Sequence, residues 1–360
     1  MKKLMLHPVS LTFWMVVLIL LLPWLLPERE LKQPSDEALR EMARSGGMLP
    51  TPLSYEGLLA VVDTPENPLT PAKIALGKQL FFDPILSWDR TLNCASCHDL
   101  GAGGDDNRAT AIGYHGRENP FHLNSPTVLN SALATAQFWD GRVKTVEDQA
   151  GGPIQAPFEM NMTPAKVEQR LNQHPTYPKA FAKVFPNEGN ITFWQVRQVI
   201  GAYERTLLTH GAYDRFLEGD NNALSPQAKR GMMLFLSRGC KGCHSGMSVG
   251  GGSLQQFPLR RFWEEYLGAV LDPKFALKRS PFPFENVGGF LGADNRLKFR
   301  VPILRNITQT APYFHNGAID KLEEAVRIMS KYQLGKEFTP QEIDAVVAFL
   351  KSLEGELVEY

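Results

Sequence analysis

The stretches CASCH (residues 94–98) and CKGCH (residues 240–244) contain all four cysteines of the chain. In a C-x-x-C-H pattern, two thiols attach a haem through its vinyl groups, and the histidine becomes the proximal ligand of the iron. The alternatives are a redox disulfide within each pair, or one zinc ion on all four thiolates. Neither explains a histidine directly after both pairs, so the sequence predicts two covalent haem c groups. The predicted attachment residues are Cys94, Cys97, Cys240 and Cys243, and the predicted proximal ligands are His98 and His244.

The sequence around these two stretches repeats as well. LGKQLFF (76–82) precedes the first and RGMMLFL (230–236) the second, so both place G-x-x-L-F on an apolar helix that begins at a Thr-Pro or Ser-Pro pair. A later amphipathic helix is expected over 192–208 and again over 340–353. The repeat predicts a mainly α fold with few strands. We expect two cytochrome c-like haem domains in tandem, residues 54–218 and 219–360.

The N-terminus has a different character. Lys2 and Lys3 precede the uncharged segment Leu11–Leu26, and Glu28 follows it closely. This segment is shorter than the ~20 residues that usually span a bilayer, but no small-x-small cleavage motif follows it. We therefore favour an uncleaved membrane anchor (residues 1–27) over a cleaved export signal, with a linker containing one short helix at 28–53. The two lysines predict a cytoplasmic N-terminus and an exported, periplasmic body.

The composition limits the remaining function classes. The 360 residues contain 38 Lys and Arg against 38 Asp and Glu, so the chain lacks the positive charge that nucleic-acid binding requires. Charged residues at 21% and aromatic residues at 10% are typical of folded protein rather than disorder. The body of the chain is therefore expected to be a folded protein that does not bind nucleic acid.

From about Leu53 onward, the chain resembles the bacterial diheme cytochrome c peroxidases. Besides the two haem-binding stretches, the matching motifs in family order are LFFDPILS (80–87), NSPTVLNSA (124–132), QFWDGR (137–142), GPIQAPFEM (152–160), DRFLEGD (214–220), VPILRNITQTAPYFHNG (301–317) and LEEAVRIMSKYQLG (322–335). The resemblance implies a first domain that reduces hydrogen peroxide and a second that transfers electrons. It also implies a small c-type cytochrome or cupredoxin as electron donor, and a homodimer.

The resemblance assigns three residues to the first haem. His115 would be its distal ligand in the resting enzyme, although this chain has Gly-Tyr-His-Gly-Arg where the family often has Gly-His-Gly-Trp. Glu159 would be the distal carboxylate that moves protons during peroxide cleavage, because burial raises a carboxyl pKa toward neutrality. Gln155 would hydrogen-bond in the same pocket. Without the family motif, Glu159 would be read as a surface or helix-start acid.

For the second haem, the resemblance implies Met329 as the axial ligand, and a thioether there favours ferrous iron. Trp139 would lie between the haems as an electron relay, and it is equally suited to be a core ring. Asn124, Thr310 and Pro312 match a calcium site built from amide and carbonyl oxygens. His315 lies in a family motif and receives no role.

The amino-acid sequence alone leaves two other functions open. A related diheme enzyme oxidises residues of a partner protein during methylamine dehydrogenase maturation, with tyrosine in place of the methionine ligand. Met329 argues against that activity, although Tyr332 is close by. The second alternative is a non-enzymatic diheme electron shuttle.

Overall fold

The two helices that precede the cysteine pairs begin where the sequence predicts. In the computed structural model, α4 (Pro71–Phe82) and α10 (Pro226–Arg238) both carry Pro at the first turn. The hydroxyl of Thr70 caps α4, and that of Ser225 caps α10. A hydroxyl cap satisfies one of the N–H groups that lack partners at a helix start. These local signals explain why the starts were predictable.

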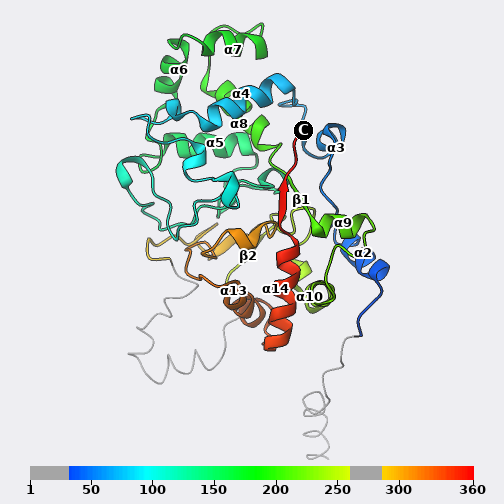
Figure 1. Cartoon of the computed structure of the whole chain (residues 1–360). Helices are drawn as coiled ribbons and strands as arrows, with labels where there is room; N and C mark the ends of the chain where they lie inside the picture. Colours follow the sequence, from blue (N-terminus) through cyan, green and yellow to red (C-terminus); the bar gives the residue numbers. More distant parts are fainter. Residues whose placement is uncertain (1–31, 260–285) are drawn as a thin grey trace, which may run out of the picture. The chain divides into compact units, whose positions relative to one another are not determined.

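Each of these helices packs against the later helix expected for its half of the chain. α8 (Phe193–Glu204) lies against α4, and α14 (Pro340–Ser352) lies against α10, as Figure 1 shows. Gly77 and Gly231, the glycines of the two G-x-x-L-F motifs, allow this close approach. A Cβ at Gly77 would lie 1.8 Å from the Val199 carbonyl oxygen, and one at Gly231 would lie 1.8 Å from that of Ala345. The repeat in the sequence therefore corresponds to two helix pairs with the same glycine contact.

The structure describes residues 32–259 and 286–360. The chain divides into two units, Met1–Pro34 and Ser35–Tyr360. No helix among the described residues is long and apolar enough to cross a membrane, and the predicted anchor lies outside them. The expected division at residue 219 stays a prediction. The remaining α-helices among the described residues are α2 (Asp36–Arg44), α3 (Tyr55–Val62), α5 (Val146–Gln155), α6 (Pro164–Asn172), α7 (Tyr177–Val184), α9 (Ala212–Glu218) and α13 (Leu322–Met329).

Strands are scarce in the described residues, as expected for a mainly α fold. β1 (Thr209–Gly211) pairs antiparallel with β4 (Gly355–Leu357), which joins the end of the chain to the segment after α8. β2 (Leu254–Gln256) pairs antiparallel with β3 (Lys298–Arg300). Each strand has three residues, so the fold is held mainly by helix packing.

Two of the buried apolar clusters account for most of the core. One lies among α4 to α8 and includes Leu80 and Val199. The other lies among α9, α10, α13 and α14 and includes Met232 and Phe349. Helix α2 belongs to this second cluster through the fully buried Leu39, so the predicted linker contributes a helix to the core beside α10.

Candidate functional site

The first C-x-x-C-H stretch lines a cavity of about 500 Å³, which we call the N-terminal cavity. Cys94, Cys97 and His98 all face it. His98 Nδ1 lies 3.1 Å from the Gly104 carbonyl oxygen, and burial lowers the pKa of His98. The ring is therefore neutral, and with the proton on Nδ1 it leaves Nε2 free to ligate a metal. These residues fit the attachment and proximal ligation of a haem.

The second stretch lines a separate cavity of about 200 Å³, the C-terminal cavity. Its lining includes Cys240, Cys243, His244 and Met329. His244 is buried. Burial lowers the pKa of His244 to about 4, so the ring is a neutral ligand. This donor set fits a second haem.

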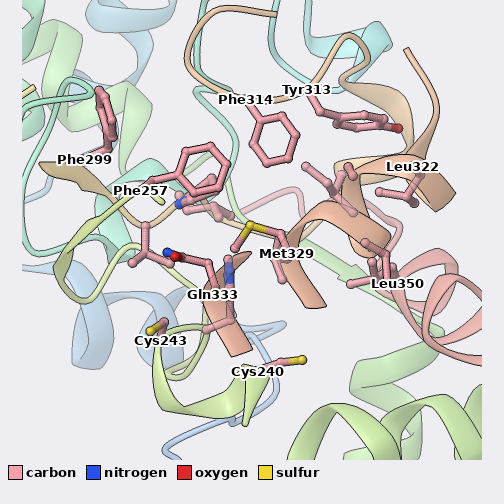
Figure 2. A pocket seen from close by; sticks show the side chains of 18 of the residues that line it. Cys240, Cys243, Phe257, Phe299, Tyr313, Phe314, Leu322, Met329, Gln333 and Leu350 are labelled. Carbon is pink, nitrogen blue, oxygen red and sulfur yellow. The ribbon is translucent and has the colours of Figure 1, made fainter. Parts of the chain in front are cut away.

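Met329 is brought into the C-terminal cavity by α13. It is the last residue of that helix, and a π-helical turn (Ser330–Leu334) follows it. Figure 2 shows its sulfur within the cavity, near Phe257, with Cys240 and Cys243 to one side. Tyr332, the nearby candidate for a phenolate ligand, is absent from the lining. Met329 therefore lines the same cavity as His244.

The separation of the two cysteine pairs bears on the alternatives to haem. Cys94 and Cys97 line one cavity, whereas Cys240 and Cys243 line the other. All four thiols are free, and no group of three or more His, Cys, Asp or Glu among the described residues could hold a metal ion. This arrangement disfavours one zinc ion bound by all four thiolates.

The two cavities share part of their lining, which we call the shared wall. It consists of Asn124, Ser125, Pro126, Thr127, Trp139 and Arg300. Trp139 is 8% exposed, and its indole Nε1 donates to the Asn124 carbonyl oxygen at 2.8 Å. Its ring also meets that of His315 edge-on, with centroids 6.3 Å apart. Trp139 is thus both a buried core ring and a fixed aromatic group between the cavities.

Glu159 lies in the N-terminal cavity, just after α5. Burial raises the pKa of its carboxyl to about 7, an effect partly opposed by the positive charge of Arg142. A carboxyl with a pKa near neutrality can both accept and return a proton. The Glu159 backbone oxygen also accepts a hydrogen bond from Tyr114 N at 2.7 Å, which joins this site to the loop that carries His115.

Two predicted residues are not brought into the N-terminal cavity. The His115 side chain is 62% exposed, stacks on Tyr114 and lies 3.8 Å from an Asp89 carboxylate oxygen. Gln155 is exposed, and its amide nitrogen donates to the Gly151 carbonyl oxygen at 2.8 Å. Neither residue lines the cavity in this structure.

Gln149, which no sequence motif singled out, lines the N-terminal cavity from α5. Val146, Ala150 and Pro153 line it from the same helix. Positions three and four apart share a helix face, so this periodicity was the available signal.

The predicted calcium residues lie close to one another. The Asn124 amide nitrogen is 3.4 Å from the Pro312 carbonyl oxygen, and Thr310 lines the same cavity. Asp105 and Asp106, which the sequence had not singled out, each keep one buried carboxylate oxygen without a hydrogen-bond partner among the described residues. Burial raises the pKa of Asp105 to about 7.

Comparison with known proteins places these features in context. Residues 71–222 match the family model of the di-haem cytochrome c peroxidases. The chain is 42% identical over 301 residues to a cytochrome c551 peroxidase of Pseudomonas aeruginosa, covering 82% of each chain. It is 40% identical over 325 residues to a cytochrome c551 peroxidase of Nitrosomonas europaea, covering 90% of each. A crystal structure of a MauG-like protein associated with microbial copper homeostasis has a TM-score of 0.69 at 26% identity, covering 82% of this chain and 94% of that one.

Proposed function

This chain belongs to the di-haem cytochrome c peroxidase family, and we propose that its two cavities have different roles. Hydrogen peroxide is reduced to water in the N-terminal cavity, and electrons enter the protein through the C-terminal cavity. The observation that carries this proposal is the pair of separate cavities, each with its own C-x-x-C-H stretch, that meet at Trp139. Two haem c groups, which the family implies, supply peroxide binding and electron storage. The electron donor would be a small c-type cytochrome or cupredoxin.

Glu159 is the proposed general acid–base group of the reaction. Its carboxylate accepts the proton of one peroxide oxygen and returns it to the other, which leaves as water. Two electrons and two further protons complete the formation of two water molecules. The support is its position in the cavity together with a pKa that burial raises to about 7. Gln149 lines the same cavity and is suited to orient the substrate by a hydrogen bond.

Electrons pass from the Met329 side of the C-terminal cavity across the shared wall. Trp139 is the aromatic group on this route, fixed by its hydrogen bond to Asn124. His115 is the proposed distal ligand of the resting oxidised enzyme. Its exposed position here means that ligation requires movement of the loop, whose neighbouring residues Ile112 and Gly113 already line the N-terminal cavity.

We expect peroxide-dependent oxidation of a reduced cytochrome to begin only after half-reduction. Reduction of the Met329 haem would release His115 and open the first haem to peroxide. The measurement is steady-state turnover of the holoprotein before and after addition of one electron equivalent. Absence of turnover in both states would leave the electron shuttle as the function, whereas equal turnover in both would remove His115 as a gate.

We propose that the protein is located in the periplasm and that residues 11–26 tether it to the membrane. The support is the charge pattern around that apolar segment and the export that haem c proteins undergo. A homodimer is proposed from the family resemblance alone. Extraction of membranes with carbonate and with detergent tests the tether, because only a membrane-anchored protein requires detergent.

Asn124, Thr310 and Pro312 are the proposed ligands of a calcium ion. The unpaired carboxylate oxygens of Asp105 and Asp106 would add negative charge near the bound ion. Oxygen donors of this kind suit a hard cation. We expect metal analysis of the purified holoprotein to find one calcium per chain, and Asn124→Ala to lose it. Asn222→Ala, on the exposed loop before α10, is the matched control. A wild-type protein free of calcium after growth in calcium would contradict the assignment.

A further inference from the structure

Arg300 is a buried cation in the shared wall. It ends β3, its side chain lines both cavities, and the residue is 3% exposed. Its backbone N–H donates to the Trp139 carbonyl oxygen at 2.7 Å, which fixes the two residues side by side. The guanidinium atoms Nε and Nη1 are buried and have no hydrogen-bond partner among the described residues.

Other buried arginines of this protein are paired. The Arg305 guanidinium donates to both carboxylate oxygens of Asp214, at 2.8 and 2.9 Å. Arg205 pairs with Glu147 and also donates to the Asn67 carbonyl oxygen at 2.8 Å. A buried charge without a partner is strongly unfavourable, so folded proteins nearly always supply a counter-ion. The polypeptide described here supplies Arg305 and Arg205 with carboxylates.

The charge of Arg300 persists despite its burial. Burial lowers the pKa of Arg300 only to about 10, so the side chain is protonated at neutral pH. A guanidinium has five N–H donors and favours carboxylates, and one such group can serve two acceptors. The missing partner is therefore an anion that is not part of the described polypeptide and that reaches a wall common to both cavities.

We propose that Arg300 is the counter-ion of haem propionate carboxylates at the shared wall, and that its positive charge raises the reduction potentials of both haems. This inference rests on the two haems of the proposed function, because each carries propionates into its own cavity. A fixed positive charge favours the ferrous state, which has one positive charge fewer than the ferric state. Arg300 is thus a positioning residue that acts on the two redox centres through one side chain.

The test is a spectroelectrochemical titration of the holoprotein with Arg300→Gln and Arg300→Lys. Arg300→Gln is expected to lower both midpoint potentials, and Arg300→Lys is expected to restore most of the shift because it keeps the charge. Arg230→Gln removes one charge from the exposed face of α10 and is the matched control. Haem content per chain and circular dichroism are measured in each variant to check assembly and folding.

The outcomes separate this inference from the proposed function. Potentials that move no further than in Arg230→Gln would overturn the role of Arg300. Equal shifts in the Gln and Lys variants would also overturn it, since they would reflect shape and not charge. A shift in one haem alone would overturn the shared role. If Arg300→Gln fails to retain haem, the Arg300→Lys variant decides. Haem retention with near-normal potentials in Arg300→Lys supports the proposal, and loss of haem from both variants overturns it. Fewer than two haems in the wild-type protein would instead overturn the proposed function.

Discussion

Replacement of Glu159 by Gln is expected to lower peroxide turnover by about two to four orders of magnitude, the usual contribution of a positioned general acid–base group. The amide preserves the shape of the side chain but cannot carry the proton between the two peroxide oxygens. Both haem spectra and both reduction potentials should remain near those of the wild type. Stopped-flow and steady-state measurements of cytochrome oxidation by peroxide provide the readout.

Glu66→Gln is the matched control, because Glu66 is exposed and lines neither cavity. It should leave turnover unchanged. If Glu159→Gln retains more than about a tenth of the wild-type rate, the carboxyl is not the proton carrier, since even modest general acid–base catalysis exceeds that factor.

The pH profile gives an independent check on the same carboxyl. The base must be ionised to accept the first proton, and burial raises the pKa of Glu159 to about 7. The value of kcat/KM for peroxide is therefore expected to fall as the pH drops through about 7, and to level off above it. The residual activity of Glu159→Gln should lack this dependence. An unchanged acidic limb in the variant would assign the titration to another group.

The elements that the sequence predicted well are those whose signals are local. The starts of α4 and α10 depend on a hydroxyl cap followed by Pro, and α8 and α14 follow from apolar periodicity. Gln155 failed to reach the cavity for an equally local reason. It lies six positions after Gln149 on a helix of 3.6 residues per turn, so the two side chains project from different faces of the helix.

The shared wall could not be predicted from such local signals. Arg300 lies far along the chain from Asn124 and Trp139. Its backbone N–H donates to the Trp139 carbonyl oxygen, and the Trp139 indole Nε1 donates to the Asn124 carbonyl oxygen, which brings the three residues together. Packing of α2 into the core beside α10 was equally hidden, because a polar segment containing one short helix reads as a linker. Tertiary contacts of this kind leave no periodic pattern in the sequence.

Met329→His is expected to lower the midpoint potential of the second haem by on the order of 100 mV or more, because a second imidazole stabilises ferrous iron less than a thioether does. The donor would then reduce this haem poorly, so cytochrome-dependent peroxide turnover should fall sharply. A strong artificial reductant should still half-reduce the variant and recover turnover. Potentiometric titration with optical detection of the second haem, in the wild type and in the variant, measures the shift.

Met233→Leu provides the control, since Met233 is buried on α10 in the same apolar cluster but does not line the C-terminal cavity. Its replacement should leave both potentials unchanged, because an apolar side chain of similar volume fills the same space. If Met329→His and Met233→Leu behave alike, Met329 is a packing residue and the asymmetry of the two haems has another origin. A shift confined to Met329→His, with turnover rescued by the stronger reductant, would establish that this thioether gives the second haem the potential at which it accepts electrons from the donor.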